Sequence, residues 1–446
     1  MHKRCIAQFS RRVERRNRTA VKTKIFLALL LPLIILQGCS KGSSTSSAPS
    51  NTSVRLINAT SAYASLDMVA SGATLAAAVT AGNTSAYASI APGTYTISLN
   101  ISGSGTPTAQ LSFLMSSGVS YAIVAHTEAG QLRLAALTES EPAPAAGDGK
   151  IRIANLALQN TGPVDIYMSG SGGTLASASA LVSNVSTSGY FELAQGTYHL
   201  WVTGVGDKAD LRLDLPSVVI ANQQIQTLIL TGTPGGTLVD GWLLTQAAAM
   251  IAQTNPSARI RVAANIAASG TVLATANGVA LDASTLLSPF VDTYVPVPAG
   301  TLSMSVVVNG ITISVPGLTA APGADLTLLA IGSGASPQFV LLSDDNTLPP
   351  GGAAKLRLVN GANGLAGNIS LTADANLVAQ NVAYGTASSA AAVATTGNIS
   401  QLQVDSAGNT ALLNYPLTLQ SQGVYSVFML GDNAAPPLTG IVRADR

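Results

Sequence analysis

One short segment, in which a hydrophobic residue and an arginine lead to an asparagine, recurs four times along this chain of 446 residues. The copies are VRLIN at 54–58, IRIAN at 151–155, IRVAAN at 260–265 and LRLVN at 356–360. Their arginines are 97, 109 and 96 residues apart. A spacing of about 100 residues is the size of a domain and is too long for the stacked unit of a solenoid. The chain is therefore constrained to repeat one kind of domain four times.

Further landmarks recur inside the units and indicate short strands. Alternating segments begin after Gly93, Gly196 and Gly300, and glycine suits a turn that needs a positive φ. About seven such segments in about 90 residues are typical of an antiparallel sandwich. We therefore predict an all-β chain of tandem immunoglobulin-like antiparallel β-sandwiches. Residues 246–253 are the stretch in which we expect one or two helical turns.

The predicted division of the chain follows the repeats and the segments rich in Ser, Thr, Pro and Ala between them. It comprises a signal peptide at 1–38, a lipidated flexible tether at 39–53, and sandwiches at 54–138, 150–245, 258–343 and 355–446. The joints at 139–149 and 344–354 would allow the sandwiches to move independently unless the interfaces between them are large.

The N-terminal segment has the pattern of an export signal. Nine Lys and Arg residues and a single Glu precede twelve apolar residues at 25–36. This apolar run is too short to span a bilayer, which takes about 20 residues as a helix. A basic segment, a short apolar core and small residues before a cut describe a signal peptide. A buried core helix is the alternative, and the cluster of cations directly before it argues against that.

Leu36-Gln37-Gly38-Cys39 resembles the lipobox of bacterial lipoproteins. The resemblance implies cleavage between Gly38 and Cys39, acylation of the Cys39 thiol by palmitate-like chains, and acylation of the new amino group. More than one acyl chain is needed for stable anchoring, and several on one residue would hold the protein at a membrane. Ser40 in place of Asp resembles the address of an outer-membrane lipoprotein. The sequence leaves open whether the periplasmic or the cell-surface side carries the sandwiches.

Charge and cysteine content exclude several classes of function. Without residues 1–38 the chain retains 13 Lys and Arg against 20 Asp and Glu, a net charge near −7. Such a chain lacks the basic surface with which proteins neutralise nucleic-acid phosphates. Cys5 belongs to the leader and Cys39 to the anchor, so the sandwiches have no disulfide available.

The repeats resemble a known group, domain of unknown function 4397, an immunoglobulin-like family of prokaryotic envelope proteins. The motifs that carry the resemblance are the first strand with its arginine, Val164-Asp165-Ile166-Tyr167 and the turn Pro92-Gly93-Thr94-Tyr95. Units one and two match best, whereas units three and four lack the aspartate, with Asn368 as the nearest substitute. The resemblance covers most of residues 54–446 and implies a fold without a known activity.

The search for catalytic and metal-binding residues gives no active site. The mature chain has two histidines, His126 and His199, in different units, and neither stands near a nucleophile motif. Zinc would need three or four His or Cys ligands in one domain. Asp344-Asp345-Asn346, or Asp207 with Asp210, offers oxygen ligands without the spacing of a calcium loop, so we expect a solvated acidic linker instead. We predict no enzyme activity, no cofactor and no metal.

Two recurrent carboxylates, Asp67 and Asp165, also need an explanation. Glycosidases use a facing pair of carboxylates, and one per domain is not that arrangement. We expect Asp67 and Asp165 to be structural, as partners of Arg55 and Arg152.

The sequence thus favours a non-catalytic lipoprotein of the cell envelope, anchored in the outer membrane. Its tandem array would serve adhesion, matrix assembly or partner binding, with a protein or polysaccharide as partner. One alternative is a carbohydrate-binding lipoprotein, for which Trp201 and Trp242, both in unit two, are the candidate stacking residues. A second alternative is an envelope hydrolase that depends on His126 or His199.

Overall fold

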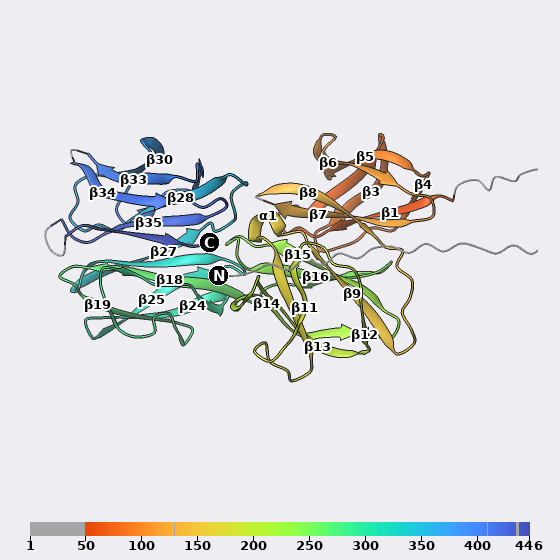
Figure 1. Ribbon diagram of the computed structural model, residues 1–446, viewed down its shortest axis with the longest axis horizontal. Helices are drawn as coiled ribbons and strands as arrows, with labels where there is room; N and C mark the ends of the chain where they lie inside the picture. The colour runs from red at the N-terminus through yellow and green to blue at the C-terminus, as the bar shows by residue number, and fades with distance from the viewer. Residues whose placement is uncertain (1–49, 129, 408, 434–436) are drawn as a thin grey trace, which may run out of the picture. The chain divides into compact units, whose positions relative to one another are not determined.

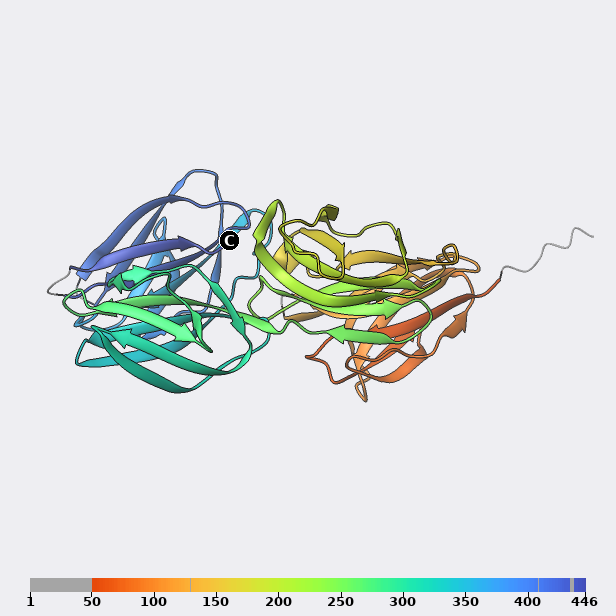
Figure 2. The ribbon, with the colours of Figure 1, turned by 90° about the horizontal axis from the view of Figure 1, so that it is seen from below.

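The structure is a computed structural model that describes residues 50–446 except 129, 408 and 434–436. The signal peptide, its cleavage site and Cys39 lie outside the described residues. The described part belongs to one compact unit, Pro49–Arg446, and forms four sandwiches of two sheets each (Figures 1 and 2). In every sandwich one sheet contains the strand with the repeated arginine. We call it the arginine sheet and its partner the outer sheet.

The first sandwich sets the pattern. Its arginine sheet has the order β4(Ala88–Ile90)-β1(Thr52–Asn58)-β7(Ser120–Glu128)-β8(Gln131–Thr138). Its outer sheet has the order β3(Ala73–Thr80)-β2(Ser65–Ala70)-β5(Gly93–Ile101)-β6(Pro107–Met115).

The second sandwich adds an edge strand. Its arginine sheet is β12(Phe191–Ala194)-β9(Asp148–Asn155)-β15(Ile225–Gly232)-β16(Val239–Thr245)-β17(Met250–Gln253). Its outer sheet is β11(Ala180–Val185)-β10(Val164–Gly170)-β13(Gly196–Gly204)-β14(Asp207–Ile220). The single helix of the described residues, α1(Leu158–Thr161), follows β9.

The last two sandwiches divide the strand beside the arginine strand into short pieces. The third has β22(Phe290–Val291)-β18(Ser257–Ile266)-β26(Asp325–Ser333)-β27(Ser336–Asp344), with β23(Val295–Pro298) also on β18. Its outer sheet is β20(Val279–Ala280)-β19(Thr271–Ala276)-β24(Gly300–Val308)-β25(Ile311–Ala320), with β21(Leu286–Leu287) also on β19.

The fourth sandwich has β31(Thr386–Ala387)-β28(Ala353–Asn360)-β35(Val424–Leu430)-β36(Thr439–Ala444), with β32(Ala391–Ala394) also on β28. Its outer sheet is β30(Asn376–Val382)-β29(Ile369–Ala373)-β33(Ile399–Ser406)-β34(Asn409–Thr418). The predicted all-β fold of tandem sandwiches is confirmed.

One feature of each arginine sheet was not predicted, a parallel pair of strands. β1 runs parallel to β7, β9 to β15, β18 to β26 and β28 to β35, whereas the other strand pairs are antiparallel. Parallel strands need a long crossover, and here the outer sheet serves as that crossover. The parallel strands are buried on both faces, as the run of seven buried residues in β35 shows.

Burial of the second face comes from a neighbouring sandwich. One apolar cluster joins Ile57 and Val124 of the first sandwich to Ala154 and Ile229 of the second. A matching cluster joins the third and fourth sandwiches. Its fully buried members are Ala263, Leu329, Ile331, Val359, Phe428 and Leu430. The residue two positions after each repeated arginine lies in one of these clusters. The sandwiches are therefore packed as two pairs, which we call the first pair and the second pair.

The segment at 246–253 is not helical, so that prediction was wrong. The chain turns tightly at Ala247, whose φ is 58°, and the Thr245 amide donates to the Ala249 carbonyl at 3.3 Å. This turn sends β17 back along β16 as an antiparallel neighbour. Pairing at the open edge of the sheet satisfies backbone groups that a single helical turn would leave to solvent.

Candidate functional site

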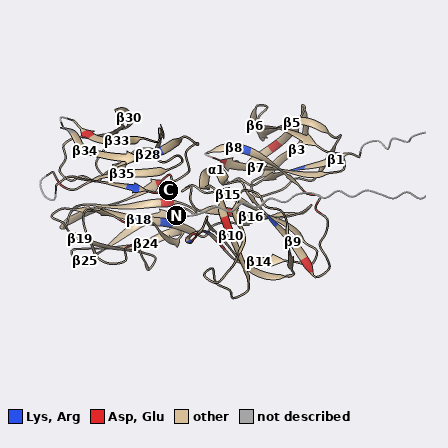
Figure 3. Ribbon diagram, viewed as in Figure 1, with Lys and Arg blue, Asp and Glu red and all other residues tan. Residues whose placement is uncertain are grey.

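A cleft of about 560 Å³ is lined by residues of the second, third and fourth sandwiches. β14 contributes Asp210 and Arg212, β18 contributes Arg259 and Arg261, and Asp445 follows β36. Charged residues are scarce in the chain as a whole, as Figure 3 shows by the predominance of uncharged ribbon. Their gathering in this cleft makes it the first candidate for a functional site.

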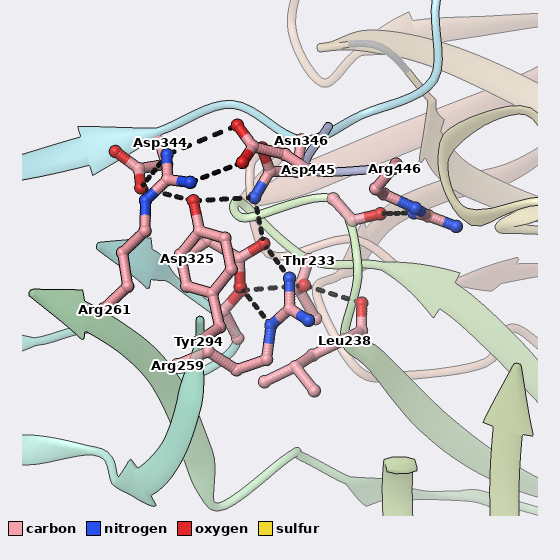
Figure 4. Close-up of polar contacts among 12 residues, drawn as sticks. Thr233, Leu238, Arg259, Arg261, Tyr294, Asp325, Asp344, Asn346, Asp445 and Arg446 are labelled. Carbon is pink, nitrogen blue, oxygen red and sulfur yellow. Dashed lines mark hydrogen bonds and ion pairs between the residues drawn. The ribbon is translucent and has the colours of Figure 1, made fainter. Parts of the chain in front are cut away.

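Arg261 is the centre of the charged cluster, and its side chain is 2% exposed. Its guanidinium forms ion pairs with Asp445 and with Asp344, the latter at 3.5 Å between Nη2 and Oδ2. Nε donates to the Thr327 hydroxyl at 2.9 Å, and the ring of Tyr294 lies 4.5 Å from the guanidinium carbon (Figure 4). The ion pairs, the hydrogen bond and the tyrosine ring together therefore hold the Arg261 guanidinium in place.

Asp344 completes the cluster from the end of β27. Its side chain is fully buried, and its Oδ1 lies 2.6 Å from Nη2 of Arg357 in the fourth sandwich. Tyr294 donates its hydroxyl to Asp344. Burial, followed by the charge of Asp344, raises the pKa of Tyr294 well above its ordinary value. Asp344 is thus an anion shared by arginines of two sandwiches, and Tyr294 stays a hydrogen-bond donor.

The prediction of a solvated acidic linker at 344–346 was wrong for two of its three residues. Asp344 and Asn346 are buried, and the Asn346 amide donates to Asp325 Oδ2 at 2.8 Å. Only Asp345 has an exposed side chain, which pairs with Lys355 at 3.0 Å. A buried arginine is costly without a partner, and Arg261 and Arg357 find theirs in the buried anion Asp344. The need of buried arginines for partners was the sequence signal that could have identified Asp344. The Pro and Gly residues after Asp344 instead made the segment resemble an exposed linker.

Two further arginines of the cleft are also paired with carboxylates. Arg259 binds Asp325 through two nitrogens, at 2.8 and 2.6 Å. Arg212 binds Asp210 in the same forked manner, at 3.0 and 2.7 Å. Such bidentate pairs have well-defined geometry and occupy the carboxylate oxygens. These ion pairs therefore fix the arginine side chains around the cleft.

The repeated arginines of the first pair are also bonded to a neighbouring sandwich, with fewer charged partners. Arg55 binds both oxygens of Glu139, the residue directly after β8, and Nη1 donates to the Ala248 carbonyl of the second sandwich at 2.5 Å. Arg152 donates to the Thr227 hydroxyl at 2.8 Å and to the Thr138 carbonyl of the first sandwich at 2.7 Å. All four repeated arginines are thus buried and reach a neighbouring sandwich.

Asp67 and Asp165 do not pair with these arginines, so that prediction was wrong. Asp67 accepts the Ala78 amide at 2.7 Å, and Asp165 accepts the Asn184 amide at 2.7 Å. Ala78 and Asn184 both have φ of 52° and lie where the strand register slips. The recurrent carboxylates therefore satisfy backbone donors at β-bulges, which is a structural role, as predicted, with a different partner.

The two histidines belong to different sandwiches, and His199 contacts Asp214, a residue of the charged cleft. His126 on β7 is buried, and burial, followed by the charge of Arg133, lowers its pKa to about 4. His199 on β13 contacts Asp214, and its ring stacks on Trp201 with centroids 3.8 Å apart. Among the described residues neither histidine makes a hydrogen bond to a Ser, Thr or Cys side chain that would act as a nucleophile.

The two tryptophans also differ in what they contact. Trp201 is 3% exposed and lies against His199. Trp242 on β16 is half-buried and lines a second cleft, of about 330 Å³, together with residues of the first sandwich.

No group of three or more potential His, Cys, Asp or Glu metal ligands occurs in the described part of the chain. Within the same residues no helix is long and apolar enough to cross a membrane.

A comparison with known protein families agrees with the repeat. The chain matches the family described as Domain of unknown function (DUF4397) over residues 52–167 and 258–372, slightly more than half its length. Each match starts in an arginine strand and ends in the outer sheet of the next sandwich. No curated protein matches the chain. Among solved structures, "The Bacillus anthracis TIE protein" matches with 10% identity and a TM-score of 0.13, over 63% of this chain and 50% of that chain.

Proposed function

The chain belongs to the DUF4397 family, and from this premise we propose that it is a non-catalytic cell-envelope lipoprotein whose paired sandwiches form a binding array. The array would serve adhesion, matrix assembly or partner binding. The observation that carries the proposal is the charged cleft, where Arg212, Arg259 and Arg261 are each paired with a carboxylate. Groups so paired hold the sandwiches in place and are not free to act as acid, base or nucleophile.

Paired packing supports a binding role in a second way. Interfaces between domains decide whether a tandem array is flexible, and large apolar interfaces restrict motion. The apolar clusters of both pairs therefore keep surfaces of neighbouring sandwiches in fixed register. A fixed array loses less entropy on binding an extended partner, and repeated weak sites add by avidity when the geometry allows.

The proposed place of action is the outer membrane, with Cys39 as the lipid anchor. The lipobox at 36–39 and the basic leader support this location. The part of the predicted tether before β1, residues 40–51, would space the sandwiches from the membrane by about 20 Å if it behaves as a flexible coil. The sandwiches would then lie in the periplasm or outside the cell.

Substitution of the anchor residue tests the proposal. We expect Cys39→Ala to move the protein from the membrane fraction to the soluble fraction, because the acyl chains supply its membrane affinity. Cys5→Ala is the matched control, since Cys5 is the other cysteine of the chain and lies in the leader. The measurement is fractionation combined with labelling by a palmitate analogue. Retention of Cys39→Ala in the membrane, or unlabelled wild-type protein, would refute the anchor.

Protease treatment of intact cells then separates the two possible sides of the membrane. Loss of the fourth sandwich, detected with an antibody, would place the array outside and favour adhesion or matrix partners. Protection until the outer membrane is opened would place it in the periplasm and favour partners in the envelope.

A further inference from the structure

The second cleft is formed mainly by the first two sandwiches. The first contributes Thr60 and Thr127, the second contributes Thr231, Asp240 and Trp242, and a proline of the third closes one side. Its volume of about 330 Å³ is near the lower limit of pockets that take small ligands. Unlike the charged cleft, it is lined by hydroxyl groups, one carboxylate and one aromatic ring. We call it the Trp242 cleft.

The indole ring of Trp242 is held in one orientation. Its Nε1 donates to the Thr231 hydroxyl at 3.2 Å across the strand pair β15 and β16. From the first sandwich, Gly82 lies against the ring, so close that a Cβ there would be 3.6 Å from Cζ3. The φ of Gly82 is 75°, which favours glycine at this position. A ring fixed at the edge of a cleft is a preorganised apolar surface.

Asp240 lies two residues before Trp242 on β16, and side chains two apart project from the same face of a strand. Its Oδ1 accepts the Asn255 amide at 2.7 Å. Asp240 forms no ion pair among the described residues, unlike Asp210 and Asp445 of the charged cleft. Burial accordingly raises the pKa of this carboxyl group. Its second oxygen is thus left to accept hydrogen bonds from a ligand.

Thr127 supplies a second polar group without a partner. Its hydroxyl oxygen, on β7, is buried and makes no hydrogen bond within the described part of the chain. A buried polar group without a partner costs about 1–3 kcal/mol unless something satisfies it. Because this oxygen is closed to solvent as the side chain stands, a ligand hydroxyl in the cleft satisfies it only after Thr127 rotates about χ1.

These observations together define the ligand. A flat face of C–H groups would cover Trp242, and neighbouring hydroxyls would reach Asp240 and Thr127. The carboxylate disfavours anions, since Asp240 has no cation beside it. A ligand cation would also find an aromatic ring and a carboxylate here. The hydroxyl side chains around the ring are uncharged and can form hydrogen bonds with ligand hydroxyls. They therefore favour a polyol over a small cation.

We propose that the Trp242 cleft binds one neutral pyranose unit of a polysaccharide, stacked on Trp242 and hydrogen-bonded by Asp240 and Thr127. The inference deepens the proposed function, on which it rests for a polysaccharide partner in the envelope or outside the cell. It also joins the first two sandwiches into one site, because Thr127 and Trp242 come from different members of the first pair.

Tryptophan fluorescence of the full protein in detergent tests this inference. The probes are neutral oligosaccharides of glucose, mannose and galactose, with choline and an acidic oligosaccharide as contrasts. Trp201→Phe leaves Trp242 as the reporter, and we expect a saturable spectral change with at least one neutral sugar. We expect Trp242→Ala to weaken binding about tenfold, as measured by calorimetry, through loss of the stacking surface. Asp240→Asn should also weaken it about tenfold, through loss of a charge-assisted hydrogen bond.

The outcomes are decisive in both directions. Saturable sugar binding that is weakened by Trp242→Ala and unchanged by Trp201→Phe supports the site. Absence of saturation with every neutral sugar, equal affinity of Trp242→Ala, or saturation by choline alone overturns it. If Trp201→Phe fails to fold, calorimetry on the wild-type protein and on Trp242→Phe still decides. Failure here would leave the lipid-anchored role intact, because that role is tested by fractionation of the Cys39 variants.

Discussion

Replacing Asp344 by Ala is expected to destabilise the second pair by about 3–5 kcal/mol, because it leaves buried arginines without their shared anion. Asp344 is fully buried and faces Arg261 and Arg357, which belong to different sandwiches. It also accepts the hydroxyl of Thr327. Removal of the carboxylate therefore leaves Arg357 without an anionic partner among the described residues, while Arg261 retains Asp445.

Hydrogen exchange of the amides in β18 and β28 is the appropriate measurement. A chain of several domains does not unfold in two states, and exchange reports the opening of each element separately. Asp345→Ala is the control, since the neighbouring Asp345 side chain is exposed and its partner Lys355 keeps a hydrogen bond to the Thr347 hydroxyl. We expect a smaller effect than that of Asp344→Ala. Equal, small effects of the two substitutions would show that the buried cluster does not hold the pair.

Phe428→Ala is expected to cost about 3–5 kcal/mol and to affect both sandwiches of the second pair. Phe428 is fully buried in the cluster between the third and fourth sandwiches, and the guanidinium of Arg261 lies 5.0 Å from its ring. The substitution would leave a cavity in the interface and remove this cation–π contact. Exchange should therefore accelerate in β26 of the third sandwich as well as in β35.

Leu402→Ala provides the comparison for Phe428→Ala. Leu402 is also fully buried, but it lies in the fourth sandwich's own core. We expect its loss to accelerate exchange in the fourth sandwich and to leave β26 unchanged. If Phe428→Ala also left β26 unchanged, the third and fourth sandwiches would not be energetically coupled.

The sequence predicted the sandwiches well because alternation and glycine turns are local signals. It located the repeated arginines but assigned them the wrong partners. Asp67 lies in the same unit, 12 residues after Arg55, yet the two belong to different sheets. Glu139, the true partner of Arg55, comes directly after the last strand of its unit, and Arg152 bonds instead to Thr227 and to the Thr138 carbonyl. The partner of each arginine is decided by which residues lie close together in the fold. That proximity depends on strand order, which the spacing of residues along the sequence does not show.

Pairing of the sandwiches was hidden for a related reason. A strand buried on both faces has a nearly continuous apolar run, and such a run does not show what covers its second face. The extra residue in the third copy of the repeated segment also changes a contact between sandwiches. It shifts Asn265 to the other face of β18, where its amide donates to the Gly361 and Gly431 carbonyls of the fourth sandwich. By contrast, Asn58 bonds within its own sandwich.

The Trp242 cleft was only partly foreseen. Trp201 and Trp242 were equal candidates for ligand stacking in the sequence, because both lie in the second unit. The structure separates them, since Trp201 is buried against His199 whereas Trp242 lines a cleft. Thr127 belongs to the first sandwich and carried no signal in the sequence. A site shared by two repeats cannot be read from either repeat alone.

Cleavage of the chain between the third and fourth sandwiches tests most directly whether the sandwiches are packed as pairs. A specific protease site is inserted between Pro350 and Gly351, which are exposed, and the cut protein is analysed by size-exclusion chromatography. The buried arginines and the apolar cluster around Phe428 predict that the two fragments elute together in native buffer and separate only in denaturant. Elution of the fourth sandwich alone in native buffer would contradict paired packing.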